Sequence, residues 1–318
     1  MKQVFIYVTL AGILLVFGSW GFYAHRQINR LAVFTLPKGI SRFYKSNISY
    51  LSDHAVDPDK RRYADTAEAP RHYLDVEAYD NCIDSIPRKW DLALKKYSRK
   101  MLQENGILPW HIQRSYLKLV NAFKQKDSVK ILICSAQLGH YIADAHVPLH
   151  TTNNHNGQLT NQVGIHAFWE SRLPELYADR YNYRVGKAFY VAQPLQEAWN
   201  MVSHTHSLVD SVLKLEASLS LSFPHYRKYS FSKRKGLLTR QYSEDYSKAY
   251  HEAMNHMVER QMRSAIHYIG SFWYSAWIDA GQPDMEQLKR IDLPFEERQK
   301  ETLENLKYEK GSIIGREY

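Results

Sequence analysis

The stretch H-Y-I-A-D-A-H-V-P-L-H, residues 140–150, contains the spacing that decides the fold. His140 and Asp144 are four residues apart, and on an α-helix this spacing places both side chains on one face, with their Cβ atoms about 5–6 Å apart. His150 follows a proline that should end or kink that helix. Histidine nitrogens and carboxylate oxygens are donors that zinc prefers. The stretch therefore predicts a helix whose end carries a metal site.

A second pair with the same spacing follows a polar loop, in the stretch I-H-A-F-W-E at residues 165–170. Its members, His166 and Glu170, should also share one helical face. With the first stretch they make five zinc-type donors within about thirty residues. We expect both stretches to contribute to one cluster, with further ligands from the rest of the chain.

Helical periodicity extends outward from this region along most of the chain. Asp127 should cap the helix that carries His140. No alternating strand pattern of convincing length is present, so the sequence predicts an all-α fold with a single multi-helix domain over residues 20–284 and a charged, loosely packed tail over 285–318. The other expected helices cover residues 20–34, 40–51, 87–103, 109–124, 185–219 and 242–280.

Length and composition suit a globular protein: the chain has 318 residues, of which 44% are hydrophobic and 24% charged. A net charge of +9 favours anionic partners such as phosphates, nucleic acid or acidic lipid, or it serves solubility. Cys82 and Cys134 are the only cysteines, so a cysteine-type metal site is excluded, and their redox state stays open.

The N-terminus has the pattern of a signal peptide. A lysine precedes an apolar run of about sixteen residues, which is short for a membrane span. Cleavage after residues 1–19 would make Trp20 the mature N-terminus and would place the protein outside the cell or in a periplasm. An uncleaved membrane anchor is the alternative.

Residues 140–154, H-Y-I-A-D-A-H-V-P-L-H-T-T-N-N, resemble the signature of bacterial zinc-dependent phospholipase C. The same superfamily contains the single-strand zinc nucleases of fungi and plants. The resemblance implies an all-helical fold, three zinc ions and a mature chain that begins with tryptophan. Trp20 and His25, five positions apart, match that last feature.

The resemblance also implies a set of metal ligands, which we carry over residue by residue. Asp57 would in addition orient the attacking water as a catalytic base. The first zinc would take Asp57, His72, His140 and Asp144, the second His150, His166 and Glu170, and the third the amine and carbonyl of Trp20 with His25, while Asp144 bridges to the first.

The chemistry explains these residue types. A phosphodiester is an anion and resists attack by water. Zinc ions lower the pKa of a shared water and neutralise charge that develops on the phosphoryl oxygens. Ligation by histidine and carboxylate leaves the metal Lewis-acidic with an open position. The pattern thus predicts a zinc-dependent phosphoric ester hydrolase.

The substrate is less clear from sequence. Glu170 and the short gap from His150 to His166 resemble the phospholipase branch, which we favour. The Trp20–His25 spacing resembles the nuclease branch. There Tyr73 would stack on a base, Asp75 would contact its edge, and Lys60 would hold a phosphate; alternatively Tyr73 and Asp75 simply pack nearby.

The expected partners are accordingly phospholipid, single-stranded nucleic acid or a nucleotide, with contact to a membrane surface, and no protein partner is inferred. A non-catalytic zinc-binding surface protein is the third hypothesis. The presence of every ligand type in order argues against it.

Overall fold

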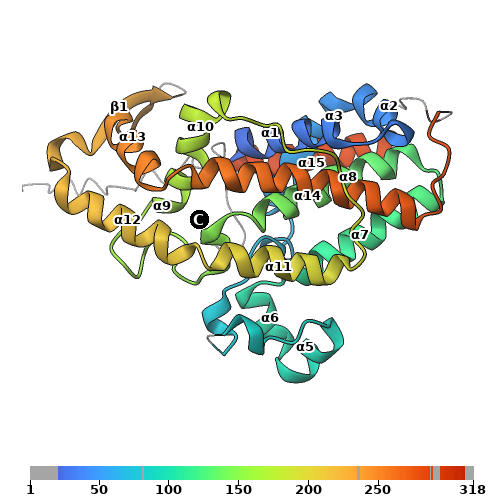
Figure 1. The fold of residues 1–318 in the computed structure, drawn as a ribbon, viewed down its shortest axis with the longest axis horizontal. Helices are drawn as coiled ribbons and strands as arrows, with labels where there is room; N and C mark the ends of the chain where they lie inside the picture. The colour runs from blue at the N-terminus through green and yellow to red at the C-terminus, as the bar shows by residue number, and fades with distance from the viewer. Residues whose placement is uncertain (1–20, 81, 235–236, 287, 289–293, 312–318) are drawn as a thin grey trace, which may run out of the picture.

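The computed structural model describes residues 21–80, 82–234, 237–286, 288 and 294–311. It is an elongated helical assembly in which α14 and the α11–α12 pair run along the long axis, while α5 and α6 form a small lobe (Figure 1). The predicted all-α fold is confirmed. The α-helices are α1 (Phe22–Ala32), α2 (Lys38–Ser46), α3 (Ile48–Asp53), α4 (Asp57–Arg61), α5 (Trp90–Lys96), α6 (Arg99–Asn105), α7 (Leu108–Lys124), α8 (Ser128–Asp144), α9 (Ile165–Ala167), α10 (Leu173–Tyr177), α11 (Pro194–His206), α12 (Val209–Ser222), α13 (Glu244–Ala253), α14 (Met257–Asp279) and α15 (Phe295–Lys310).

Helix α8 lies at the centre of the fold and carries the first half of the metal motif. Its N-terminus is capped as predicted, because the Asp127 side chain accepts a hydrogen bond from the backbone N–H of Lys130 at 3.0 Å. From Leu138 onward every residue of the helix is buried. The helix packs against α7, α14, α1 and α3, so its last turn is surrounded by protein.

A close contact between α1 and α8 depends on Gly139. A Cβ atom at this position would lie 2.0 Å from Asn29 Oδ1, so only glycine fits there. Asn29 in turn donates a hydrogen bond to the Ala136 carbonyl of α8 at 3.1 Å. This contact brings the two helices together beside the site, and the rings of His25 and His140 stack with centroids 4.2 Å apart.

The structure divides two of the long predicted helices. In residues 242–280 the break lies at Asn255 and His256, which have φ values of 45° and 60° that an α-helix cannot contain. In residues 185–219 the helix begins only at α11, where a proline occupies the first turn. The predicted helix is then divided between α11, which ends at His206, and α12, which begins at Val209.

A short β-hairpin was not predicted. Strands β1 (Tyr229–Arg234) and β2 (Leu237–Tyr242) pair in antiparallel fashion. The alternation Y-S-F-S-K was present in the sequence, but the run is short. Of its two aromatic residues, Tyr229 packs against the core and Phe231 is exposed.

The charged C-terminal segment is more ordered than expected, because it contains α15, which packs on α4. Glu301 Oε1 lies 3.4 Å from His54 Nδ1, and Glu304 Oε1 lies 3.6 Å from Arg61 Nε. Phe295, Leu303 and Leu306 nevertheless remain exposed, so the expectation of loose packing stays a prediction. Within the described part of the chain, no helix combines the length and the apolar character that crossing a bilayer requires.

Candidate metal centre

Seven of the predicted ligands converge in one buried cluster. The five imidazoles and Asp144 are each no more than 3% exposed, and Glu170 is 12% exposed. Their close approach confirms that distant segments meet at the end of α8. The contributors are α1 (His25), the turn after Ala69–Arg71 (His72), the last turn of α8 (His140, Asp144), the 3-10 turn Pro148–Thr151 (His150), α9 (His166) and the π-helical turn Phe168–Arg172 (Glu170).

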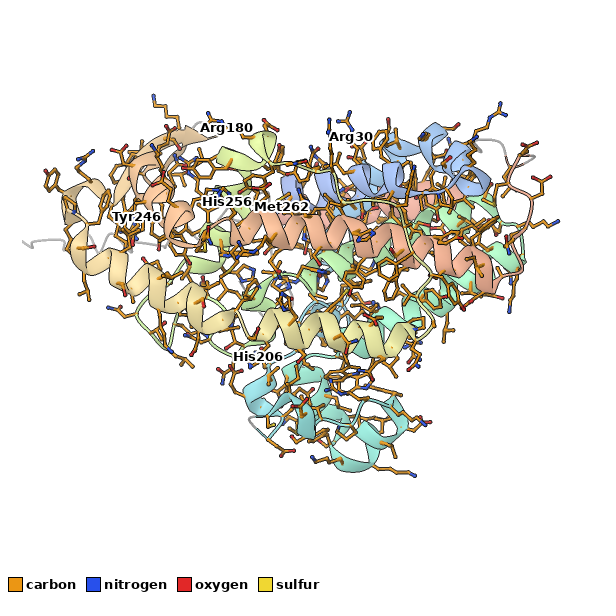
Figure 2. All side chains as sticks on the ribbon, in the orientation of Figure 1. Arg30, Arg180, His206, Tyr246, His256 and Met262 are labelled. Carbon is orange, nitrogen blue, oxygen red and sulfur yellow. The ribbon has the colours of Figure 1, made fainter. Side chains whose placement is uncertain are left out.

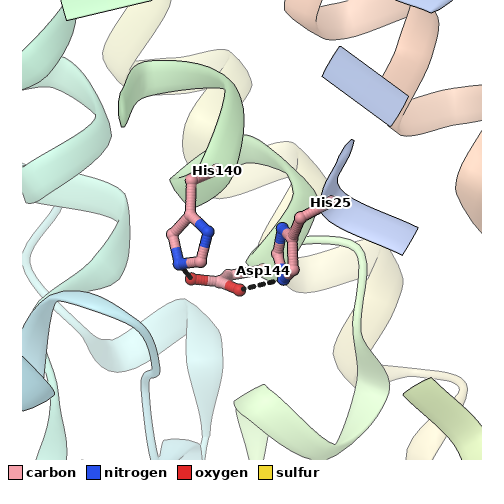
Figure 3. Close-up of side chains that lie close together, drawn as sticks. All are labelled: His25, His140 and Asp144. Atoms are coloured by element: carbon pink, nitrogen blue, oxygen red, sulfur yellow. Dashed lines mark ion pairs between the residues drawn. The ribbon is translucent and has the colours of Figure 1, made fainter. Parts of the chain in front are cut away.

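Asp144 is the centre of the first group of donors. Its Oδ2 lies 3.0 Å from His72 Nδ1 and 3.2 Å from His140 Nε2. Its Oδ1 lies 3.4 Å from His25 Nε2, as Figure 3 shows together with His140. Although Asp144 is only 1% exposed, Oδ1 accepts no hydrogen bond from the residues that the structure describes. A buried carboxylate oxygen of this kind calls for a cation.

A second group forms around Glu170. Its Oε2 lies 2.7 Å from His166 Nε2 and 3.4 Å from His150 Nε2. Its Oε1 lies 3.1 Å from His25 Nε2, so the two groups adjoin. The π-helical turn that carries Glu170 differs from the plain helix that we predicted, and π-turns are frequent at functional sites.

The structure does not bring Asp57 to His72 and His140, and Asp59 occupies that place. Asp59 Oδ1 lies 3.7 Å from His72 Nδ1 and 3.7 Å from His140 Nε2. Asp57 instead accepts a hydrogen bond from His54 Nδ1 at 2.6 Å. Two residues apart on α4, the carboxylates point to nearly opposite sides, so only one can face the cluster. Sequence spacing alone could not show which one.

The orientation of the imidazoles fits zinc. His140 Nδ1 donates to the Ala55 carbonyl and His150 Nδ1 to the His72 carbonyl, each at 2.8 Å. Each Nε2 is therefore left with a lone pair. His150 Nε2 faces His166 Nε2 at 3.1 Å, and His140 Nε2 faces His72 Nδ1 at 3.0 Å. Nitrogens bound tetrahedrally at about 2.0–2.1 Å from zinc are separated by about 3.3 Å. The nitrogen pairs are thus spaced much as zinc requires.

The electrostatics keep both central carboxylates ionised. Burial raises the pKa of Asp144, but the neighbouring His140 and His150 outweigh it and hold that pKa well below its usual value. Burial also raises the pKa of Glu170, and contacts with His150 and other imidazoles again lower it well below the ordinary value. For His72, burial lowers the pKa, but the hydrogen bonds to Asp144 and Glu68 together with the charges of nearby carboxylates raise it above its ordinary value. Both carboxylates can therefore offer ionised oxygens as metal ligands.

A buried carboxylate behind His72 was missed. Glu68 is fully buried, and its Oε1 lies 3.5 Å from His72 Nε2, on the side of the ring away from Asp144. Arg71 and Tyr141 donate hydrogen bonds to it. Burial raises the pKa of Glu68, but these surroundings hold it far below the usual range. Such a carboxylate orients a ligating imidazole. Glu68 precedes His72 by four residues, and this spacing was the feature of the sequence that could have predicted their contact.

The expected substrate-binding residues are paired or buried in the structure. Lys60 Nζ donates to Asp57 Oδ1 at 3.2 Å. Tyr73 is 3% exposed and its hydroxyl donates to the Glu104 carbonyl at 3.2 Å, while Asp75 is 6% exposed. A ring that is covered by protein cannot stack on a base. The burial of Tyr73 and Asp75 favours the alternative in which both residues pack beside the site.

Trp20 lies outside the described residues, as do residues 1–19. The first described residue, Gly21, lies beside the cluster: a Cβ atom there would be 3.3 Å from Glu170 Oε1. Gly21, directly before α1, thus lies next to Glu170.

The sequence pattern of a family described as "Zinc dependent phospholipase C" matches residues 24–233, about two thirds of the chain. The chain belongs to the zinc-dependent phospholipase C family. Membership confirms the resemblance found in the sequence and supports a zinc-dependent phosphoric ester hydrolase. The family match covers all seven converging side chains and Asp59. No curated protein matches the chain.

Solved structures with a similar fold include two clostridial toxins. The alpha-toxin of Clostridium perfringens from an avian strain has a TM-score of 0.50 and 16% identity, over 86% of this chain and 67% of that one. The alpha toxin of Clostridium absonum has a TM-score of 0.46 and 13% identity, over 86% and 66%. The chain therefore spans about two thirds of the toxins' length. The first likeness supports the all-α fold of the zinc-dependent phospholipase C family.

Proposed function

We propose that the chain is an exported phospholipase C that uses three zinc ions to hydrolyse a phosphate ester of a phospholipid headgroup. One observation carries the proposal: three of the four donor groups in the described chain adjoin at the end of α8, and each has its ligand atoms within 4.8 Å of one another, where an ion could bind. These groups are His25 with His140 and Asp144, Asp59 with His72 and His140, and His150 with His166 and Glu170.

When bound, zinc supplies an activated water and neutralises charge on the phosphoryl oxygens. The protein would hold His140 and His150 in the ligating tautomer through their backbone hydrogen bonds and would keep Asp144 ionised between the groups. Asp59, at 22% exposure, is more accessible than these three. We therefore assign it the role first given to Asp57: it accepts the proton of the attacking water.

Export would complete the metal centre. Cleavage after residue 19 frees the amine of Trp20, and Gly21 already lies beside Glu170. The third ion would then take this amine and the Trp20 carbonyl together with His25, with Asp144 shared. An amine still acylated by residues 1–19 could not ligate, so the proposal links localisation to zinc content.

Phospholipid is favoured over nucleic acid as the substrate for two reasons. The family match is to phospholipase C. In addition, the residues that argued for a base pocket, Tyr73 and Asp75, are buried. The Trp20–His25 spacing remains the one feature that favours a nuclease.

A side-by-side assay tests the proposal. The purified mature protein should hydrolyse phosphatidylcholine vesicles, lose this activity with chelator and regain it with zinc. Single-stranded DNA under the same conditions should stay intact. Cleavage of the DNA alone would favour a nuclease instead. Cleavage of neither the vesicles nor the DNA would favour a non-catalytic zinc-binding protein.

The zinc count is tested separately. Metal analysis and intact mass of the exported protein should show Trp20 as the first residue and about three zinc ions per chain. A variant that begins at Met1 and is retained uncleaved should bind fewer. Equal zinc content in the two forms would contradict the role of the Trp20 amine.

A further inference from the structure

The β-hairpin presents apolar and basic side chains on its outer face. Phe231 pairs with Arg240, and Lys233 pairs with Leu238, so these four side chains share one face of the two-stranded sheet. Phe231 is 66% exposed and Leu238 is 68% exposed. Lys233 and Arg240 are exposed as well. We refer to these four residues as the hairpin face.

The opposite face of the hairpin is polar and partly buried. It carries the pairs Ser232–Thr239 and Ser230–Gln241, all of which are partly buried. The Oγ atom of Ser232 and the Oε1 atom of Gln241 are inaccessible to solvent. An antiparallel sheet at a protein surface normally places apolar residues inward and polar residues outward. The hairpin face follows this rule only at its base, where the neighbouring pair Tyr229–Tyr242 packs on the core. Burial within the protein does not explain the position of Phe231 and Leu238 farther along the same face.

The hairpin is firmly attached to the metal-binding segment at its base. Tyr242, at the end of β2, stacks on Phe168 with ring centroids 3.9 Å apart. Phe168 lies between His166 and Glu170 in the sequence, and it also stacks on Tyr246 of α13, which Figure 2 labels near this end of the molecule. The outer face is therefore held on a packed base next to the donors.

The segment that leads into β1 extends the exposed apolar character. Leu221, in the last turn of α12, is 91% exposed, and Tyr226 is 86% exposed. Figure 1 shows the hairpin at one end of the elongated molecule, beyond α10, where it can reach an external surface.

We infer that the hairpin face docks the protein on a phospholipid bilayer that contains anionic lipid. Apolar side chains enter the headgroup boundary, while neighbouring lysine and arginine side chains attract anionic lipids. The net charge of +9 adds to this attraction. The inference rests on the proposed function, because a phospholipid substrate lies in a bilayer and an attached enzyme stays near it.

Vesicle sedimentation tests the docking surface without hydrolysis if every protein also carries Asp59→Asn. We compare vesicles of equal parts phosphatidylcholine and phosphatidylglycerol with vesicles of phosphatidylcholine alone. Phe231→Ser/Leu238→Ser should weaken binding to both, on the order of tenfold. Lys233→Glu/Arg240→Glu should abolish the preference for the anionic vesicles. Leu117→Ser, at a residue 57% exposed on α7, is the matched control and should bind normally.

Hydrolysis of a monomeric short-chain phosphatidylcholine by the same variants with Asp59 intact separates docking from catalysis. The hairpin variants should retain this activity while their vesicle binding falls. Undiminished vesicle binding by both variants would overturn the inference. It would also be overturned by a dimer that Phe231→Ser/Leu238→Ser dissociates, since a second copy would then cover the face. Hairpin-dependent vesicle binding with no phosphatidylcholine hydrolysis would support docking while contradicting the proposed function.

Discussion

Replacement of Asp59 and of Asp57 by asparagine gives the sharpest test of the metal centre, because the two residues differ in position but hardly in chemistry. Asp59 Oδ1 lies 3.7 Å from both His72 Nδ1 and His140 Nε2, whereas Asp57 pairs with His54 and Lys60. Asp59→Asn removes a ligand charge and a proton acceptor. General bases contribute about 10²–10⁴-fold to a rate, so kcat should fall by that order.

Asp57→Asn is the matched control. It weakens two ion pairs whose members are 17% to 22% exposed, and such pairs contribute about 0–1 kcal/mol each. We expect a loss of about 1 kcal/mol in the free energy of unfolding and a kcat within about twofold of the wild type.

The assay is hydrolysis of monomeric short-chain phosphatidylcholine, with zinc content measured on the same samples and stability measured by urea unfolding. Asp59→Asn should lose activity and part of its zinc while it remains folded. The opposite result, with Asp57→Asn inactive and Asp59→Asn active, would refute Asp59 as the ligand and base. It would support Asp57 in that role, as the sequence spacing predicts.

Three further predictions concern the residues that support the site. Glu68→Gln should lower zinc affinity by about 10–100-fold, measured by chelator competition, whereas Asp65→Asn at the edge of the same ion-pair group should leave it unchanged. Gly139→Ala should lower the free energy of unfolding by about 1–3 kcal/mol, because the new Cβ atom would lie 2.0 Å from Asn29 Oδ1. If the additional substitution Asn29→Ala recovered none of this loss, the clash would not be its cause. Burial lowers the pKa of His146 to about 4, while an unfolded histidine titrates near about 6.5. The unfolded chain therefore binds more protons between these values, and stability should fall as the pH falls through this window, by roughly 3 kcal/mol in full. His146→Gln should flatten that part of the urea-unfolding profile, and parallel profiles would contradict the reasoning.

Much of the site was predictable because its chemistry is local. His140 with Asp144 and His166 with Glu170 have a spacing that puts donors on one face of a turn, whatever surrounds them. The capping by Asp127 is equally local, since it depends on a side chain and an N–H three residues away.

The errors arose where a side chain had a choice of direction or of neighbour. Asp57 and Asp59 are equivalent in type, and only the packing of α4 against α8 decides which faces His72. Tyr73 was predicted to bind substrate because it follows a ligand, yet its side chain is buried and its hydroxyl donates to the Glu104 carbonyl. The hairpin was not predicted because its strands are short and because exposed Phe231 and Leu238 blur the usual contrast between a buried apolar face and an exposed polar one.

The sequence by itself determined the all-α class, the zinc-type donors and the segments that carry most of them, because helical periodicity and ligand chemistry are properties of short stretches. Only the tertiary structure decided that Asp59 joins His72 and His140, that Glu68 stands behind His72, and that Phe231 and Leu238 face outward. These facts depend on contacts between residues far apart in the chain or on the direction in which a packed element presents its faces, and neither is encoded in local spacing.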